Sequence, residues 1–167
     1  MDSDMVTFRE MTTNDLEFFL EVRNSCAPEY LHDSRKFKFN EAYKWWVYGP
    51  KKEYYIIEHN GVKIGYFRTS NYSETNKNIY IGADLHSDWR GMGLSYIAYR
   101  QFIPFMFESL QLHKISLEVL GNNTRAINLY KKLGFIEEGR KRDEVFKNGI
   151  YVDSIIMSIL KDEYEKV

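Results

Sequence analysis

The sequence predicts a mixed α/β protein in which about four helices flank a central, mostly antiparallel sheet of about seven strands. Segments such as residues 6–11 alternate apolar and polar side chains, as half-buried strands do. Asn-Gly pairs at 60–61 and 148–149 separate apolar runs, which indicates two tight β-hairpins. Other segments space apolar residues every three or four positions, as amphipathic helices do. We expect residues 1–167 to form one domain.

The first half of the chain predicts three strands and two helices. Thr13 is the predicted N-cap of the first helix, since a threonine oxygen can accept a hydrogen bond from a free backbone N–H. The second helix is expected to end before Gly49-Pro50. The expected elements are a strand at 6–11, a helix from 13 to about 24, a helix at 41–47, and strands at 54–57 and 62–69.

The second half predicts four further strands and two helices. A polar loop at 71–78 precedes them. Pro104 lies inside a helical pattern and removes a backbone hydrogen bond, so it should kink or split that helix. Gly134 is expected to end the last helix. The expected elements are a strand at 79–85, a helix from about 93, a strand at 114–119, a helix at 123–133, and strands at about 135–146 and 150–159.

The composition and charge narrow the range of possible functions. The formal net charge is −1, and no basic stripe suits a phosphate backbone, so we expect no nucleic-acid partner. The single cysteine, Cys26, cannot form an internal disulfide and is expected to be an inert, buried thiol in a reducing compartment. No stretch reaches the ~20 apolar residues that span a bilayer, and residues 1–5 do not resemble a secretory signal. We therefore expect a cytoplasmic protein without membrane contact.

A glycine-containing segment between a strand and a helix predicts an anion site. The segment is Trp89-Arg90-Gly91-Met92-Gly93-Leu94-Ser95. Its two glycines allow the backbone to approach a ligand closely, and the helix start presents free N–H groups to an anion such as a pyrophosphate. The alternative is an ordinary tight turn. The segment matches neither a Walker A loop nor a dinucleotide fingerprint.

A second segment, residues 119–135, places two polar side chains on one helix face. Asn123 and Tyr130 are seven residues apart, which is two helical turns. Tyr130 could donate its phenolic proton from that face. The alternative is a tyrosine packed in the core.

Together the two segments resemble the GNAT superfamily of N-acetyltransferases. Arg90-Gly91-Met92-Gly93-Leu94-Ser95 is similar to that family's R-x-x-G-x-G/A pyrophosphate loop, although Ser95 stands where the family prefers Gly or Ala. Asn123-Thr124-Arg125-Ala126 with Leu129-Tyr130-Lys131-Lys132-Leu133-Gly134-Phe135 is similar to its N-x-x-A…LY-x-K-x-GF segment. The resemblance is specific over roughly residues 79–140 and weak before residue 50.

The resemblance implies a splayed pair of strands, 82–85 and 115–119, with acetyl-CoA between them as co-substrate and no metal. It implies that the backbone N–H near Leu85 faces the thioester oxygen, which makes an oxyanion donor. It implies that Asn123 contacts the pantetheine arm and that Tyr130 protonates the leaving thiolate. The implied acetyl-CoA contacts are Asp84, Leu85, His86, Arg90, Gly91, Met92, Gly93, Leu94, Ser95, Asn123, Ala126, Tyr130 and Lys132.

A general base is needed because an ordinary acceptor amine, with a pKa of ~10.4, is almost fully protonated near neutral pH. Glu118 is the first candidate because it lies on one of the strands that should splay. Asp84 and His86 are the next candidates. A water chain is the alternative, and each of the three side chains could equally have a structural role.

The identity of the acceptor amine is the feature that the sequence predicts least well. Val22-Arg23-Asn24 is similar to a W-R-N segment of GNAT enzymes that act on amino-sugar nucleotides, so such a nucleotide ranks first, before a protein N-terminus and a polyamine. Arg23 could instead stabilise the helix end. The expected acceptor-binding residues are Arg23, Asn24, Tyr30 and Tyr66, with Trp45 and Trp46 as stacking or core residues. A non-catalytic binding module remains an alternative, and a homodimer is possible.

Overall fold

A computed structural model describes residues 5–51 and 53–164. Most of the segment 1–5, which was predicted not to be a secretory signal, lies outside the described residues. The chain groups into two compact units. The first contains residues up to Thr69 together with Ala83–Ala98, and the second contains Ser70–Gly82 together with the chain from Tyr99 onward.

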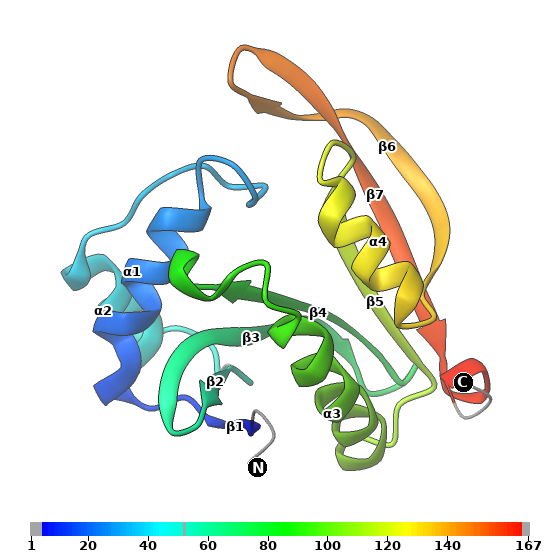
Figure 1. The fold of residues 1–167 in the computed structure, drawn as a ribbon, viewed down its shortest axis with the longest axis horizontal. Coiled ribbons are helices and arrows are strands. Elements are labelled where there is room, and N and C mark those ends of the chain that lie inside the picture. Colours follow the sequence, from blue (N-terminus) through cyan, green and yellow to red (C-terminus); the bar gives the residue numbers. More distant parts are fainter. Residues whose placement is uncertain (1–4, 52, 165–167) are drawn as a thin grey trace. The chain divides into compact units, whose positions relative to one another are not determined.

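The elements follow one another largely as the sequence predicts (Figure 1). The strands are β1 Val6–Glu10, β2 Tyr55–His59, β3 Val62–Ser73, β4 Asn78–Leu85, β5 Lys114–Leu120, β6 Ile136–Lys147 and β7 Ile150–Leu160. The helices are α1 Leu16–Cys26, α2 Phe39–Tyr48, α3 Leu94–Ser109, α4 Thr124–Lys132 and the short α5 Lys161–Tyr164, with 3-10 turns η1 Thr13–Asp15 and η2 Ser87–Trp89.

The strands pair in the order β1-β2-β3-β4-β5-β7-β6. Neighbouring strands are mostly antiparallel, but β4 and β5 run parallel. Their paired residues run only from Asn78–Lys114 to Tyr80–Ser116, although both strands continue. The predicted fold class is therefore confirmed.

The core of the first unit lies between α1, α2 and the strands β2 and β3. Phe19 of α1 stacks on Trp45 of α2, with ring centroids 5.4 Å apart, and lies 4.5 Å from the Tyr66 ring of β3. Ile56 of β2 is completely buried in the same cluster. Trp45 and Tyr66 therefore serve the core, which was one of the two roles that the sequence left open for Trp45.

The second unit builds its core from β5, β6, β7 and the C-terminal part of α3. Buried side chains in it include Phe102, Ile103, Met106, Leu117 and Met157. Pro104 does not split the helix, because α3 is continuous from Leu94 to Ser109. The buried residues on either side of the proline hold both turns in place, which offsets the loss of one backbone hydrogen bond.

Two other boundaries differ from the predictions. The first helical turn is capped by Thr12 rather than Thr13, because the Asp15 carboxylate reaches back to the Thr12 N–H at 2.9 Å. β3 continues to Ser73 and β4 begins at Asn78, so only the turn at 74–77 remains of the predicted loop at 71–78. Both Asn-Gly turns are confirmed, since Asn60 and Gly61 have positive φ angles of 49° and 82° and the pair at 148–149 has 50° and 81°.

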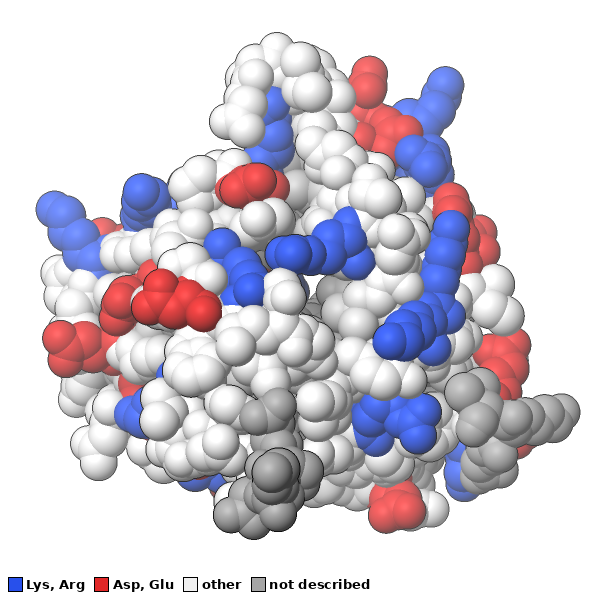
Figure 2. Space-filling model, in the orientation of Figure 1, with Lys and Arg blue, Asp and Glu red and all other residues white. Residues whose placement is uncertain are grey.

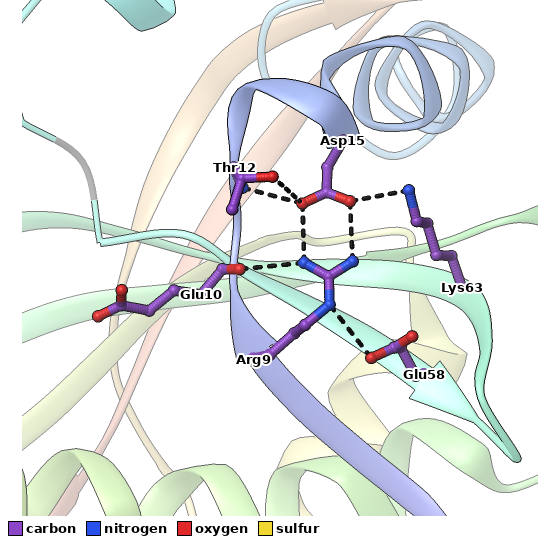
Figure 3. Close-up of polar contacts among 6 residues, drawn as sticks. All are labelled: Arg9, Glu10, Thr12, Asp15, Glu58 and Lys63. Atoms are coloured by element: carbon purple, nitrogen blue, oxygen red, sulfur yellow. Dashed lines mark hydrogen bonds and ion pairs between the residues drawn. The ribbon is translucent and has the colours of Figure 1, made fainter.

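Asp15 joins the start of α1 to the edge of the sheet through a charge cluster (Figure 3). Its carboxylate is 1% exposed and accepts two hydrogen bonds from Arg9, at 2.8 and 2.9 Å. Lys63 of β3 lies 2.8 Å away on the other side, and Glu58 pairs with Arg9 at 3.3 Å. Burial alone would raise the pKa of Asp15, but the bonds from Arg9 and Lys63 outweigh it and hold that pKa well below its usual range.

Candidate active site

The C-terminal end of β4 lies unusually close to β3. A Cβ added to Gly65 would lie 2.3 Å from the Asp84 carbonyl oxygen and 2.6 Å from the Leu85 side chain. The N–H of His86, one residue further on, donates to the Ile64 carbonyl at 2.8 Å. Only glycine at position 65 permits this approach, so it fixes where the backbone at Leu85 lies.

The side chain of Arg90 turns back onto that same strand end. Its Nε donates to the Leu85 carbonyl at 3.0 Å, and its Nη2 donates to the sulfur of Cys26 at 3.1 Å. The guanidinium also lies over the ring of Tyr30, 5.1 Å from its centroid. The residues expected at the pyrophosphate and at the acceptor, Arg90 and Tyr30, therefore contact each other.

The backbone after Arg90 has the shape expected of an anion cradle. Gly91 and Gly93 have φ angles of 78° and 76°, in the left-handed region that favours glycine. No atom lies within 4 Å of a Cβ built on Gly93, and Met92 is exposed. Helix α3 begins directly afterwards at Leu94, so its first N–H groups, including that of Ser95, belong to the helix start.

Asp84 and His86 flank Leu85, and both have partners. Asp84 is 6% exposed and pairs with Arg68 of β3 at 3.2 Å. His86 accepts a hydrogen bond at Nδ1 from the Asp88 N–H at 3.2 Å, which caps η2, and its Nε2 lies 3.3 Å from Glu21. With Nδ1 accepting, the neutral imidazole carries its proton on Nε2.

Tyr66 was expected at the acceptor, but it is 1% exposed and packs in the core. Burial, and secondly the charge of Asp84, raise its pKa well above the usual value. Its ring packs against Phe19 and stacks on Tyr54.

Arg23 and Asn24 fasten the segment between α1 and α2. Arg23 donates to the carbonyl of Arg35 at 2.6 Å, and its guanidinium lies over the Phe37 ring at 4.5 Å. Asn24 exchanges two hydrogen bonds with the Phe37 backbone, at 2.8 and 3.0 Å. Hydrogen bonds from Arg35 lower the pKa of Asp33 in this segment to about 2.

The second unit holds the remaining predicted residues. The Asn123 side chain accepts a hydrogen bond from the Ala126 N–H at 3.2 Å and so caps α4. Tyr130 is 9% exposed, and its ring meets Tyr99 edge-on at 5.8 Å. Lys132, in the last turn of α4, is exposed.

Glu118 lies on β5, two residues beyond the last residue that pairs with β4. One carboxylate oxygen accepts a hydrogen bond from Lys141 of β6 at 2.8 Å, and the other accepts one from Ser154 of β7 at 3.2 Å. The hydrogen bond and charge of Glu118 raise the pKa of Lys141. A comparable triad, Lys114, Ser158 and Glu138, spans the same three strands in the part of β5 that still pairs with β4.

Sequence reasoning missed two contributors to the strand end at Leu85. Cys26 is buried, as expected, but its sulfur lies 3.7 Å from the Leu85 carbonyl as well as beside Arg90. Burial, aided by the charge of Asp84, raises its pKa. Gly65 carried a usable signal, since a glycine between apolar strand residues indicates a close backbone approach. Cys26 carried none.

Charges of both signs are spread over the face shown in Figure 2, as the net charge of −1 leads one to expect. Within residues 5–51 and 53–164, no helix is long and apolar enough to cross a membrane. The same ranges contain no group of three or more His, Cys, Asp or Glu side chains placed to hold a metal ion.

Known proteins resemble this chain along most of its length. Spermidine N(1)-acetyltransferase of Escherichia coli (strain K12) is 25% identical over 163 residues, which cover 95% of this chain and 88% of that protein. The putative ribosomal N-acetyltransferase YdaF of Bacillus subtilis (strain 168) is 29% identical over 107 residues, which cover 64% of this chain and 58% of that protein.

A solved structure gives the same picture. The crystal structure of spermidine N-acetyltransferase from Vibrio cholerae in complex with CoA and spermine has a TM-score of 0.88 and 25% identity, and the match covers 96% of this chain and 98% of that one. These relatives are named for polyamine or ribosomal substrates. They do not favour the amino-sugar nucleotide that the sequence placed first, and they favour its alternatives instead.

The model of the acetyltransferase (GNAT) family matches residues 16–135, which is most of the chain and includes both motif segments. The protein therefore belongs to the GNAT family of acetyltransferases, and it is an N-acetyltransferase with acetyl-CoA as its co-substrate.

Proposed function

We propose that the protein acetylates a polyamine of the spermidine type. The observation that carries the proposal is how much of this chain each similar protein matches. Matches to spermidine acetyltransferases cover 95% of the chain or more and so include the N-terminal third, where the family resemblance places the acceptor. The match to the ribosomal acetyltransferase covers 64% of the chain. A sequence similarity over nearly the whole chain is the stronger support for acceptor class.

The contacts of Arg23 count against a sugar nucleotide. Its guanidinium binds the Arg35 carbonyl and lies over Phe37, and Asp33 is 3.9 Å away. Recognition of a pyrophosphate would require the Arg23 guanidinium to leave these partners. We assign Arg23 and Asn24 to holding the segment between α1 and α2, and so to shaping the acceptor region indirectly.

Acetyl transfer to a polyamine also gives roles to the residues expected to contact acetyl-CoA. The backbone N–H groups from Gly91 to Ser95 would bind the pyrophosphate, and Asn123, Ala126 and Lys132 would lie along the coenzyme. The Leu85 N–H would donate to the thioester oxygen as the acceptor nitrogen attacks the carbonyl carbon. Tyr130 would give its proton to the sulfur as the C–S bond breaks, and the phenolate would be reprotonated from solvent.

We assign Glu118 to the acceptor amine, as the general base that would accept the proton the nitrogen loses when it attacks. It lies on the part of β5 that no longer pairs with β4, and it already holds a primary ammonium group, that of Lys141. A carboxylate and a serine hydroxyl that bind one ammonium can bind another of the same chemistry. Glu118→Gln should therefore lower kcat/KM for the acceptor by at least tenfold. Glu138→Gln, in the comparable triad of the paired part of the sheet, is the matched control and should change it less than twofold.

The acceptor is tested by thiol release from acetyl-CoA, with the product identified by mass spectrometry. The full chain is supplied in turn with spermidine, spermine, an alanine-initiated peptide and an amino-sugar nucleotide. We expect kcat/KM for spermidine to exceed that for the peptide by tenfold or more. A peptide that is acetylated faster than either polyamine would overturn the polyamine assignment and would favour a protein N-terminus. YdaF is named as a putative ribosomal N-acetyltransferase.

A further inference from the structure

One peptide group at the end of β4 is held at both of its polar ends. The carbonyl of Leu85 receives the Nε of Arg90 at 3.0 Å and the sulfur of Cys26 at 3.7 Å. The N–H of the same peptide group, that of His86, donates to the Ile64 carbonyl at 2.8 Å. Leu85 itself is 8% exposed and lies against Gly65, where any side chain would collide. The backbone torsions at Leu85 therefore have little freedom.

The guanidinium that holds this carbonyl is itself fixed by the end of α1 and the turn that follows. It donates to Cys26 at 3.1 Å and lies over the Tyr30 ring at 5.1 Å. These contacts, together with the bond to the Leu85 carbonyl, use two nitrogen atoms and one face of the Arg90 guanidinium. The motif resemblance assigns this arginine to the pyrophosphate, but the backbone N–H groups that follow Arg90 are anion donors that do not need its side chain.

We propose that Arg90 and Cys26 are positioning residues for acetyl transfer: by holding the Leu85 carbonyl they fix the backbone torsions at Leu85, so that the N–H of Leu85 keeps the direction needed by the thioester oxygen. The inference rests on the role given above to the Leu85 N–H. An oxyanion donor works only when it is held close to the position where the charge develops, and loss of one donor typically costs about 10²–10³-fold in rate. A displaced donor should lose part of that factor.

The experiment separates positioning from phosphate binding. The variants are Arg90→Met, Arg90→Lys and Cys26→Ala, with Arg142→Met as a charge-matched control on β6, where the side chain is exposed. We expect Arg90→Met to lower the single-turnover acetyl-transfer rate by about 10–100-fold, while the Kd for CoA measured by calorimetry changes less than threefold. Arg90→Lys should recover little, because an ammonium cannot hold the carbonyl and the sulfur together.

Cys26→Ala tests the same device without a change of charge. It should lower the transfer rate by a smaller factor, about 3–10-fold, since a thiol is a weak hydrogen-bonding group. In both variants the ¹H–¹⁵N resonances of Leu85 and His86 should shift, and in Arg142→Met they should not. If Arg90→Met does not fold, Arg90→Lys and Cys26→Ala decide the question.

Two results would overturn the inference. One is a tenfold or larger rise in the Kd for CoA in Arg90→Met with an unchanged transfer rate, because that is the signature of a phosphate ligand. The other is an unchanged rate, with unshifted Leu85 and His86 resonances, in both Arg90→Met and Cys26→Ala. The resonances and the Kd require no acceptor. If spermidine is not acetylated but these resonances shift at constant Kd, the polyamine assignment fails and the positioning role stands.

Discussion

Packing contacts hold Tyr130, the residue that we propose as the general acid. Its ring lies edge-on to Tyr99 at 5.8 Å and is 60° from the plane of Phe135 at 6.0 Å. These contacts hold the ring in place and leave the role of the hydroxyl to be tested.

Tyr130→Phe keeps the ring contacts and removes only the hydroxyl. We expect kcat to fall by about 10²-fold or more, which is the usual contribution of a general acid, with little change in the KM for acetyl-CoA. Steady-state kinetics with a saturating acceptor measures both constants. Phe135→Tyr, on the neighbouring ring, is a control that adds a hydroxyl nearby. An unchanged kcat in Tyr130→Phe would assign the residue to packing alone.

Asp15 makes a residue-scale prediction about stability and pH. Its folded-state pKa is lowered, so its stabilisation is fully present above the unfolded pKa of about 4 and is lost as the pH falls below that value. Asp15→Asn should destabilise the protein at pH 7 by about 2–4 kcal/mol, since it leaves Arg9 and Lys63 without their shared carboxylate. Urea unfolding at pH 7 and near pH 3 should show that the difference from the natural chain shrinks at the lower pH.

Asp33→Asn is the control for that experiment. Asp33 also pairs with an arginine, but the Arg35 side chain is 75% exposed, and an exposed pair stabilises by about 0–1 kcal/mol. Its removal should therefore change the free energy of unfolding far less than Asp15→Asn does. Equal effects of the two substitutions would show that burial of the Asp15 cluster adds nothing to the free energy of unfolding.

At the scale of elements, the contact between β3 and the end of β4 depends on Gly65. A methyl group there would meet the Asp84 carbonyl at 2.3 Å, well inside contact distance, and backbone cannot yield as a flexible side chain does. Gly65→Ala should destabilise the protein by about 1–3 kcal/mol through overpacking and should also lower kcat, because the Leu85 N–H moves with the strand.

The matched substitution is Gly139→Ala on β6, where nothing lies within 4 Å of an added Cβ and φ is not positive. It should leave both the melting temperature and kcat nearly unchanged. The comparison is made by thermal unfolding and by single-turnover kinetics. A kcat loss in Gly65→Ala that exceeds its loss of folded fraction is the specific result expected. Full activity in a stable Gly65→Ala would refute the link between β3 and the donor.

At the scale of the whole molecule, the prediction is stabilisation by the coenzyme. CoA at 100 times its Kd should stabilise the folded chain by about 2.7 kcal/mol, seen as a rise in melting temperature. Gly93→Trp should abolish most of that rise by filling the cradle. Gly61→Trp is the matched control, since Gly61 also has a positive φ, 82° against 76°, and open space around it. It should melt lower, like Gly93→Trp, yet keep the rise with CoA.

The sequence alone determined the parts of the protein that depend on adjacent residues. The Asn-Gly turns, the glycine turn before α3 and the end of α4 before Gly134 are local requirements of backbone conformation, and a few neighbouring residues are enough to express them. The order of the strands and helices followed from the same local patterns, and with it the family.

The tertiary structure decided which distant side chains meet. Arg90 finds Cys26 64 residues away, and Glu118 finds its partners Lys141 and Ser154 at separations of 23 and 36 residues. Such pairs depend on strand register and on the packing of α1 near the end of β4, and a register shift of one residue would turn every side chain of a strand to the other face. No local pattern carries that information, which is why the contact of Arg90 with the Leu85 carbonyl could not be predicted from the sequence.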